Sequence, residues 1–253
     1  MARRIVITSG KGGVGKTAIT GALGLKLAEM GKRVVLLDLD FGLNNLDVVC
    51  GVESSIVYDI IDVLEGRCRV KQSLIQTAHK NLYVIPSSHC YNKDVSGQKI
   101  KLLIEGLSGE FDYVLIDCPA GIDFGFERAI SSSNEALVVV NPNVQSIRDA
   151  DKVLTILKSY QLEGVFLIVN KVRPKLVKKG KMLSENQIEN ILQTKIISVI
   201  HDSDEILLCK DIFLPQMSKA NKQLKQLAKN VEKNFAGARN FQQVYGGLFK
   251  GGN

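Results

Sequence analysis

The chain has 253 residues, of which 45% are hydrophobic and 23% are charged, and its formal net charge is +7 at pH 7. This length and composition suit one large α/β domain with a sizeable core, without the need for a second domain. The positive charge is compatible with an anionic partner such as a nucleotide, a nucleic acid or a lipid surface. It is equally compatible with a soluble protein that is simply basic.

Disulfide-rich, zinc-binding and membrane-spanning proteins are disfavoured. No C-x-x-C pair and no clustered histidine accompany the five cysteines, which are Cys50, Cys68, Cys90, Cys118 and Cys209. The N-terminus runs directly into an apolar stretch at residues 5–7 and leaves no room for a signal peptide. No apolar run approaches the ~18 residues of a spanning helix. We therefore expect a cytoplasmic protein whose membrane contacts are peripheral.

Short apolar runs rich in Val, Ile and Leu alternate along the chain with amphipathic helical stretches. This alternation predicts an α/β fold in which a mostly parallel, doubly wound sheet is flanked by helices in a single domain. The strands are expected at residues 4–8, 33–38, 82–86, 113–117, 136–141, 165–170 and 196–200. The first long helix should end at Gly31, and a helix over residues 146–160 should be capped by Ser146.

A phosphate-binding loop is predicted between the first strand and the first helix. The pattern G-x-x-x-x-G-K-[ST] is matched by Gly10, Lys11, Gly12, Gly13, Val14, Gly15, Lys16 and Thr17. Backbone N–H groups of the loop and of the helix N-terminus can surround phosphates, Lys16 can reach the β and γ phosphates, and the Thr17 hydroxyl can ligate Mg²⁺. The alternative is a glycine-rich turn with a chance lysine. The strand and helix on either side favour the P-loop NTPase fold and the binding of ATP.

Acidic residues end two of the predicted strands. Asp38 and Asp40 close one strand and Asp117 closes another, where the carboxyl ends of parallel strands converge on the ligand crevice. Carboxylates at that edge suit Mg²⁺ and its waters. The turn at residues 119–121 after Asp117 is placed to sense a γ-phosphate. Any one of these aspartates could instead only cap a turn.

Lys11 lies early in the loop, where most phosphate loops carry no charge. With this lysine, residues 11–17 resemble the deviant Walker A loop of the ParA/MinD family of P-loop ATPases, in which such a lysine crosses a dimer interface to the nucleotide of the partner. The resemblance covers most of the chain and is greatest to the MinD branch. It is carried by the segments 38–43, 45–47, 57–59, 81–83, 117–122 and 148–151.

The resemblance implies roles for particular residues. Catalysis would depend on Lys11, Lys16 and Asp40, the last orienting the attacking water. Mg²⁺ would be bound by Thr17 with the help of Asp38 and Asp117. The nucleotide would contact residues 10–17 and Ala18, with Asn170 and Asp202 near the adenine. Departures from the family pattern occur at Ala18, Asn143 and His201, where Thr, Glu and Pro are usual.

The C-terminal residues form a candidate membrane anchor, which divides the chain into an ATPase domain at 1–238 and a tail at 239–253. One helical face would carry the apolar side chains Phe241, Val244, Tyr245, Leu248 and Phe249. Gly246 and Gly247 each cost about 1 kcal/mol in a helix interior relative to Ala, so the helix should form only on a surface. The alternative is a terminal turn that packs on the domain or frays.

The resemblance also implies partners: an ATP-dependent homodimer, the anionic inner face of the cell membrane, a MinC-like division inhibitor and a MinE-like activator of hydrolysis. Arg148, Asp149 and Asp151 resemble the partner-binding face, although a charged first helical turn is also typical of any solvated helix. Two alternatives remain. One is a ParA-like or flagellar-number (FlhG-like) ATPase acting in DNA segregation or polar positioning, with a basic cluster at residues 175–181. The other is a metabolic phosphotransferase.

Overall fold

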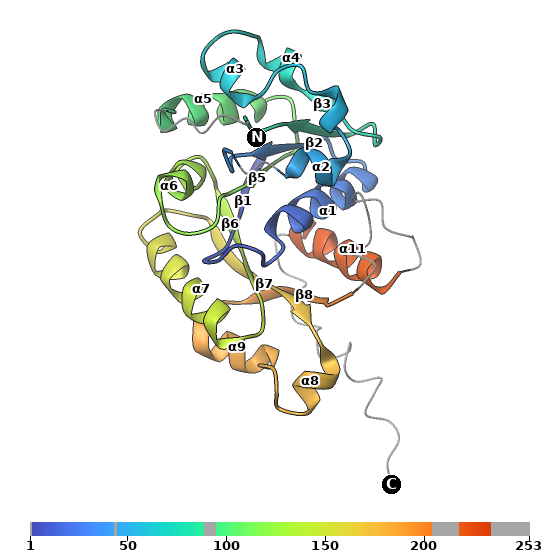
Figure 1. The fold of residues 1–253 in the computed structure, drawn as a ribbon, viewed down its shortest axis with the longest axis vertical. Coiled ribbons are helices and arrows are strands. Elements are labelled where there is room, and N and C mark those ends of the chain that lie inside the picture. Colours follow the sequence, from blue (N-terminus) through green and yellow to red (C-terminus); the bar gives the residue numbers. More distant parts are fainter. Residues whose placement is uncertain (1, 43–44, 89–94, 204–217, 234–253) are drawn as a thin grey trace.

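One eight-stranded sheet runs through the centre of the computed structural model, which describes residues 2–42, 45–88, 95–203 and 218–233 (Figure 1). The strand order is β3-β4-β2-β5-β1-β6-β7-β8, and all pairings in the described part are parallel except that of β3 with β4. The strands are β1 (Arg3–Thr8), β2 (Val34–Asp38), β3 (Ile75–Gln76), β4 (Leu82–Ile85), β5 (Tyr113–Asp117), β6 (Glu135–Val140), β7 (Gly164–Val172) and β8 (Ile196–His201).

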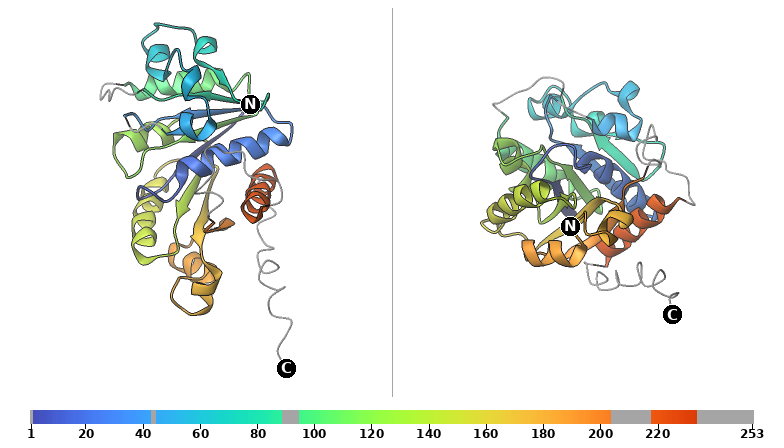
Figure 2. Two further views of the ribbon diagram at one scale, coloured as in Figure 1. Left: turned by 45° about the vertical axis from the view of Figure 1, so that its right-hand side comes forward. Right: turned by 60° about the horizontal axis from the view of Figure 1, so that its bottom comes forward.

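Helices cover both faces of the sheet, as the views in Figures 1 and 2 show. On one face, α1 and α11 lie side by side and α2 packs near α1. The other face is covered by α3, α5, α6, α7 and α9. The helices are α1 (Lys16–Glu29), α2 (Leu46–Cys50), α3 (Ile60–Leu64), α4 (Val70–Ser73), α5 (Gly97–Leu107), α6 (Phe124–Ile130), α7 (Val144–Leu157), α8 (Pro174–Lys178), α9 (Glu185–Leu192) and α11 (Lys219–Glu232), with a 3₁₀ helix η1 (Glu53–Ser55).

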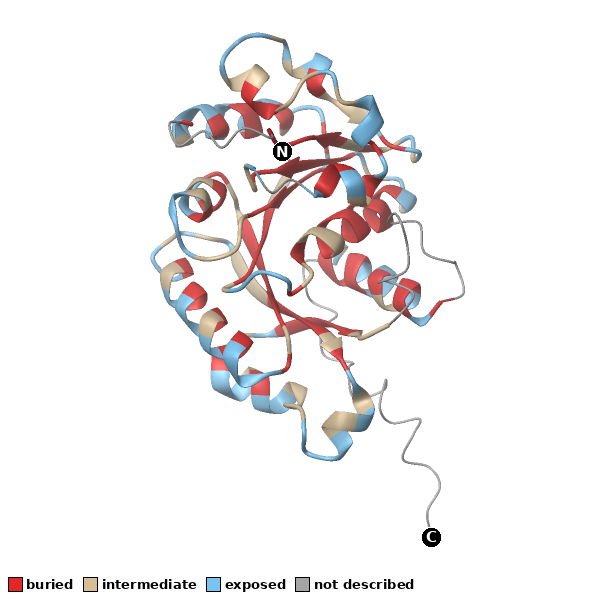
Figure 3. Cartoon of the chain, in the orientation of Figure 1, coloured by how far each residue is buried: buried red, intermediate tan, exposed pale blue. Residues whose placement is uncertain are grey.

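The central strands are apolar on both sides because each side faces a core. In β2, Val35 and Leu37 belong to the core beneath α3 and α5, whereas Val34 and Leu36 belong to the core beneath α1. All five residues of β2 are buried, as are all five of its neighbour β5 (Figure 3). Alternating side chains point to opposite faces, so a strand covered on both faces loses the polar alternation of a solvent-exposed sheet.

Helix ends follow local chemistry. Gly31 has a φ of 87°, a left-handed conformation that glycine adopts without steric cost, and α1 ends just before it as predicted. The prediction for α7 was wrong in one respect, because the cap is Asn143 rather than Ser146. Asn143 Oδ1 accepts the N–H of Ser146, and Ser146 Oγ accepts the N–H of Asn141. Ser146 therefore lies inside the first turn and stabilises the chain before it.

The seven predicted strands are confirmed, with ends that differ by at most a few residues. Strand β3 was missed because two residues are too short to show a periodic pattern. The predicted tail at 239–253 lies outside the described residues, as do its apolar residues Phe241, Val244, Tyr245, Leu248 and Phe249.

Gly24 lets α1 approach β2 and β4 closely, and this packing generates a stability prediction. A Cβ added at Gly24 would lie 2.6 Å from Leu36 Cδ2 and 3.1 Å from Leu82 Cδ1, and both leucines are fully buried. Gly24→Val should therefore lower the free energy of unfolding by about 1–3 kcal/mol in urea titration, because the added methyl groups overpack the core.

Gly106→Val is the matched control. Gly106 is also helical, in α5, but a Cβ there meets nothing within 4 Å. The same change should be neutral or slightly stabilising there, since valine is a better helix former than glycine by a few tenths of a kcal/mol. If both substitutions changed the free energy of unfolding by the same amount, the close packing of α1 on the sheet would not explain the glycine at position 24.

Candidate functional site

The loop between β1 and α1 leaves the N-terminus of α1 open. Gly13 and Gly15 have φ values of 74° and 100°, and Gly15 is the N-cap residue of α1. No side chain caps this helix, and its first turn contains no acidic residue. By contrast, Asn143 caps α7 and Ser218 caps α11. The free N–H groups and the positive end of the helix dipole at Gly15 and Lys16 therefore favour an anion such as a phosphate.

The start of the loop is fixed by close contact with α7. A Cβ at Gly10 would lie 2.3 Å from the carbonyl oxygen of Asp149, so no other residue fits without moving the backbone. Ser9 Oγ donates a 2.7 Å hydrogen bond to the carbonyl oxygen of Lys11 and holds the following turn. The loop is thus positioned by backbone packing before any ligand binds.

Asp38 and Asp117 lie at paired register positions on the adjacent strands β2 and β5. Both are buried. Asp117 Oδ1 accepts a 3.2 Å hydrogen bond from Thr20 Oγ1, and Asp38 accepts the backbone N–H groups of Asp40 at 2.9 Å and of Leu46 at 3.2 Å. Asp38 therefore orients the segment that carries Asp40, in addition to any role toward a metal.

The environment of these carboxyl groups raises their pKa values. Burial raises the pKa of Asp117 to about 6, against the opposing effects of the Thr17 hydroxyl and the Lys16 ammonium group. Burial and the charge of Asp117 hold the pKa of Asp38 well above its usual range. Burial also raises the pKa of Asp40, and Lys16 opposes this. A divalent cation would relieve the repulsion and desolvation of the buried pair, so the residues present fit Mg²⁺.

The site is not a closed metal cage. Among the described residues, no three His, Cys, Asp or Glu side chains gather closely enough to hold an ion by themselves. Mg²⁺ retains several waters and typically binds one or two protein oxygens together with substrate phosphates. The arrangement of Thr17, Asp38 and Asp117 is therefore suited to a cation that arrives with a phosphorylated ligand.

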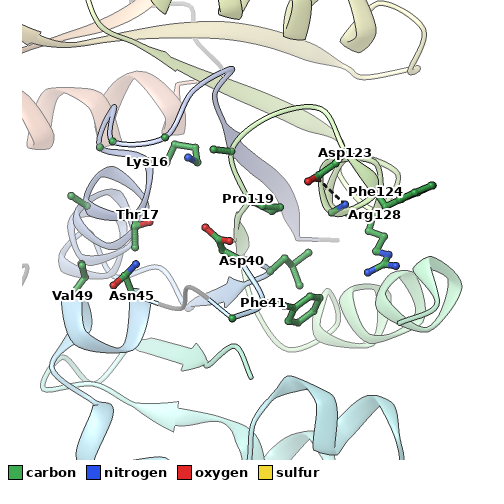
Figure 4. Close-up of a pocket in the computed structure, with 18 residues that line it drawn as sticks. Lys16, Thr17, Asp40, Phe41, Asn45, Val49, Pro119, Asp123, Phe124 and Arg128 are labelled. Atoms are coloured by element: carbon green, nitrogen blue, oxygen red, sulfur yellow. Dashed lines mark hydrogen bonds between the residues drawn. The ribbon is translucent and has the colours of Figure 1, made fainter. Parts of the chain in front are cut away.

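A cavity of about 1270 Å³ opens between the loop, the segment after β2 and the turn after β5. Figure 4 shows Lys16, Thr17 and Asp40 facing this space. Its lining comprises Gly12, Gly13, Gly15, Lys16, Thr17, Ala18, Leu39, Asp40, Phe41, Gly42, Asn45, Val49, Pro119, Ala120, Asp123, Phe124, Gly125 and Arg128. Ala18 thus faces the cavity with a methyl group, where a threonine would offer a hydroxyl.

Lys11 does not line this cavity. Its side chain is exposed and its Nζ donates a 3.0 Å hydrogen bond to Gln145 Oε1 on α7. Val144, beside Gln145, is 74% exposed. Phe124 begins α6, after the turn that follows β5, and is 77% exposed. The N–H of Gly121 in that turn donates to the carbonyl oxygen of Ser9. Lys11 therefore lies on an outer surface of mixed charged and apolar character.

The residues predicted near an adenine do not line this cavity, and one of them, Asn170, contacts the loop. Asn170 Nδ2 donates a 2.8 Å hydrogen bond to the carbonyl oxygen of Val14. Asp202 accepts a 2.6 Å hydrogen bond from Arg173 Nε. Contact of Asn170 and Asp202 with a base stays a prediction. Burial lowers the pKa of His201, the residue before Asp202.

The predicted partner-binding residues lie together on α7. Arg148 and Asp151 are exposed, and Asp149 is partly buried, with its carboxylate 3.6 Å from Lys152 Nζ. The backbone of Asp149 is the surface that Gly10 contacts. The candidate partner face and the phosphate loop are therefore in direct van der Waals proximity.

Two residues that contact the site were missed in the sequence. Thr20 lies four residues after Lys16 and one turn further along the buried side of α1, so a search for polar residues on that side would have found it. Lys171 Nζ donates a 2.8 Å hydrogen bond to the carbonyl oxygen of Gly13. No periodic pattern marks Lys171, because its contact depends on the end of β7 lying against the loop.

The fold and this site together define a P-loop ATPase domain of the doubly wound α/β class. A family model described as an AAA domain matches residues 2–172. The septum site-determining protein MinD of Bacillus subtilis is 43% identical over 82% of this chain and 79% of that protein, and its namesake from Thermotoga maritima is 39% identical over 94% and 89%. The chain belongs to the MinD family of septum site-determining proteins, within the ParA/MinD group.

Solved structures of MinD proteins have the same fold as this chain. A chain from the MinC:MinD cell division protein complex of Aquifex aeolicus superposes with a TM-score of 0.86 at 39% identity, covering 92% of this chain and 96% of that one. MinD of Pyrococcus horikoshii, complexed with Mg-ADP, gives a TM-score of 0.83 at 28% identity, covering 95% and 100%. A ParA-family ATPase from Chlorobium tepidum is only 21% identical and shares the fold.

In the described ranges, no helix has the length and apolarity required to cross a bilayer.

The raised pKa of Asp117 predicts a cost of ionisation in the nucleotide-free protein. The folded-state pKa of about 6 lies above the ordinary 3.8, so the native state holds this proton more tightly than the unfolded chain does. Stability is therefore lost as the pH rises from 3.8 to about 6 and stays lower above it. Asp117→Asn should raise the free energy of unfolding by about 1–3 kcal/mol near neutral pH. Urea titration at several pH values measures this gain, which should vanish below pH 3.8.

Asp62→Asn provides a control of opposite sign. The backbone N–H of Asp59 lowers the pKa of Asp62, so its ionised form stabilises the native state above the ordinary pKa, and this stability is lost as the pH falls through the lowered value. The Asn variant should be less stable than the parent near neutral pH. Destabilisation by Asp117→Asn under the same conditions would refute the assigned cost of burial.

Proposed function

We propose that the protein binds ATP with Mg²⁺ and hydrolyses it to ADP and phosphate, as a MinD-like switch in the placement of the division septum. The observation that carries this proposal is the open N-terminus of α1 together with the buried pair Asp38 and Asp117, of which Asp117 accepts a hydrogen bond from Thr20 in the same helix. Anionic phosphates suit the first, and a divalent cation suits the second. The Mg-ADP in the related MinD structure of Pyrococcus horikoshii supports the same ligands here.

The loop, the buried carboxylate pair and Asp40 have distinct roles in the proposed reaction. Backbone N–H groups of residues 12–17 bind the phosphate oxygens, and Lys16 neutralises charge that develops between the β and γ phosphates. The Thr17 hydroxyl and the carboxylates of Asp38 and Asp117 hold Mg²⁺, which supplies electrostatic stabilisation to the transferred phosphoryl group. Asp40 lines the same cavity and is placed to orient a water molecule.

Dimerisation is proposed to bring Lys11 to the nucleotide of the partner. Two observations support this: the Lys11 side chain is exposed, and it lies outside the cavity of its own chain. Lys11 also contacts Gln145, the neighbour in sequence of the exposed apolar residue Val144. Two copies related by a two-fold axis would present this surface to one another.

Membrane binding and partner recruitment complete the proposed switch. The tail at 239–253 would be too weak to anchor a monomer stably, whereas two tails in one dimer gain effective concentration. Arg148, Asp149 and Asp151 on α7 would recruit a MinC-like inhibitor, a proposal supported by the MinC:MinD complex of a relative. Hydrolysis, stimulated by a MinE-like activator, would then release the monomers. Relatives named MinD, at 39–43% identity, favour this function over DNA segregation.

Asp40→Ala tests the catalytic part of the proposal. Loss of the carboxylate that orients water should lower the turnover number by about 10²–10⁴-fold while ATP binding is retained. Phosphate release measures turnover, and light scattering after gel filtration with ATP measures mass. The variant should accumulate as a dimer. An ATP-bound Asp40→Ala protein that stays monomeric would refute the dimer and leave nucleotide binding intact.

Lys11→Ala, introduced into the Asp40→Ala background, distinguishes the role of Lys11 in dimerisation from the role of Lys16 in ATP binding. ATP binding should persist, because Lys16 remains, but the dimer should be lost. Lys80→Ala is the matched control, because Lys80 is also an exposed lysine and lies far from the loop, at the β3 edge of the sheet. It should dimerise normally.

Membrane binding is checked with vesicles of phosphatidylglycerol and phosphatidylethanolamine. The full chain should co-sediment with ATP and not with ADP, and deletion of residues 239–253 should abolish co-sedimentation while leaving dimerisation unchanged. Increasing salt should weaken binding, since part of the attraction is to anionic headgroups. Binding that is independent of ATP, or that survives the deletion, would overturn the role of the tail.

A further inference from the structure

Two consecutive residues at the end of β7 hold two consecutive carbonyl groups of the phosphate loop. Asn170 Nδ2 donates to the carbonyl oxygen of Val14 and Lys171 Nζ donates to that of Gly13, both at 2.8 Å. These bonds join segments that are 156 and 158 residues apart in the sequence. Neither Asn170 nor Lys171 lines the cavity, so both act on the loop from behind.

The backbone at Lys171 is strained in a way that serves these contacts. Lys171 has a φ of 57°, the left-handed conformation, which is uncommon for a residue with a side chain. The pairing of β7 with β8 shifts its register between Val169 and Val172, so Lys171 lies in an irregularity of the sheet. Backbone strain of this kind persists only where the surrounding structure enforces it, and it is concentrated at functional sites.

Close packing around Gly15 reinforces the contact. A Cβ at Gly15 would lie 2.5 Å from Asn170 Nδ2, so the loop and the Asn170 side chain are already in contact, and only glycine leaves room for both. The φ of 100° at Gly15 imposes the same requirement for glycine.

Holding a carbonyl group also orients an N–H group. The described residues contain no cis peptide bond, and in a trans peptide the C=O of one residue and the N–H of the next point in opposite directions. The Gly13 carbonyl therefore fixes the N–H of Val14, and the Val14 carbonyl fixes the N–H of Gly15. Because Lys171 and Asn170 bind these carbonyls from behind, the two N–H groups are directed away from β7, toward the side where a phosphate would bind.

We propose that Lys171 is a positioning residue for phosphate binding: its ammonium group, with the amide of Asn170, fixes the peptide planes of the loop so that the N–H groups of Val14 and Gly15 are oriented before the nucleotide arrives. A charged donor on the carbonyl also polarises the peptide unit and strengthens the N–H as a donor. The proposal rests on nucleotide binding at this loop. It concerns affinity for phosphates, not the chemical step.

Lys171→Met, which keeps the length of the side chain and removes the donor, tests the proposal. The dissociation constants of ATP and of a fluorescent ADP analogue, measured with Mg²⁺, should rise about five- to tenfold, which is within the net contribution of one typical intramolecular hydrogen bond. KM should rise in parallel, and the turnover number should stay within about twofold, because the contact is the same before and during reaction. In the nucleotide-free protein, hydrogen exchange at the Val14 and Gly15 amides should accelerate.

Two further variants separate positioning from general stability. Lys171→Arg keeps a charged donor and should restore most of the affinity. Lys99→Met is the matched control, because Lys99 Nζ also donates to a backbone carbonyl, that of Leu64 at 3.0 Å, far from the loop. It should change neither nucleotide affinity nor exchange at the loop.

The outcomes are distinguishable. Lys171→Met with the affinity and loop exchange of the parent would overturn the proposal, as would a fall in turnover number without a rise in KM. If the parent protein binds neither ATP nor ADP, the proposed function fails, whereas hydrogen exchange still decides whether Lys171 holds the loop.

Discussion

The parallel register of β2 with β5 places two buried carboxylates side by side, and the rest of the site depends on this constraint. Asp38 and Asp117 occupy matching positions on the two strands and are both buried. Burial disfavours their charge, and each disfavours the charge of the other. Their surroundings partly compensate: Thr20 donates to Asp117, and two backbone N–H groups donate to Asp38. The two carboxylates still repel each other and remain poorly solvated. A cation that arrives with phosphates offsets both effects.

Helix α1 connects this electrostatic problem to the hydrophobic core. Its first turn has no side-chain cap and is free for a ligand, while its later turns pack tightly on the sheet at Gly24. A helix whose N-terminal N–H groups lack partners needs stabilisation from elsewhere. The apolar face of α1 supplies it through buried residues such as Leu23 and Leu27. Core packing thus stabilises α1 without a side-chain cap, and the N–H groups at its N-terminus stay available to a ligand.

Much of this architecture follows from patterns in the sequence. The seven strands confirmed by the structure are continuous apolar runs. The loop is a local sequence motif, with a strand directly before it and a helix directly after it. The details that escaped prediction are set by tertiary proximity. Thr20 and Asp117 are 97 residues apart, and no local pattern joins them. The Asn143 cap was missed because Ser146, three residues later, is an equally good capping residue by type.

The absent side chain of Gly10 has a mechanical consequence. The first residue of the loop touches the backbone of Asp149 so closely that no atom could be added between them. Packed protein interiors are nearly incompressible, so a displacement of Gly10 toward α7 must displace α7. The exposed side of that helix presents Arg148 and Asp151. Binding or loss of a ligand at the loop can therefore reach the molecular surface as a rigid-body shift of α7, with no hinge between the loop and this helix.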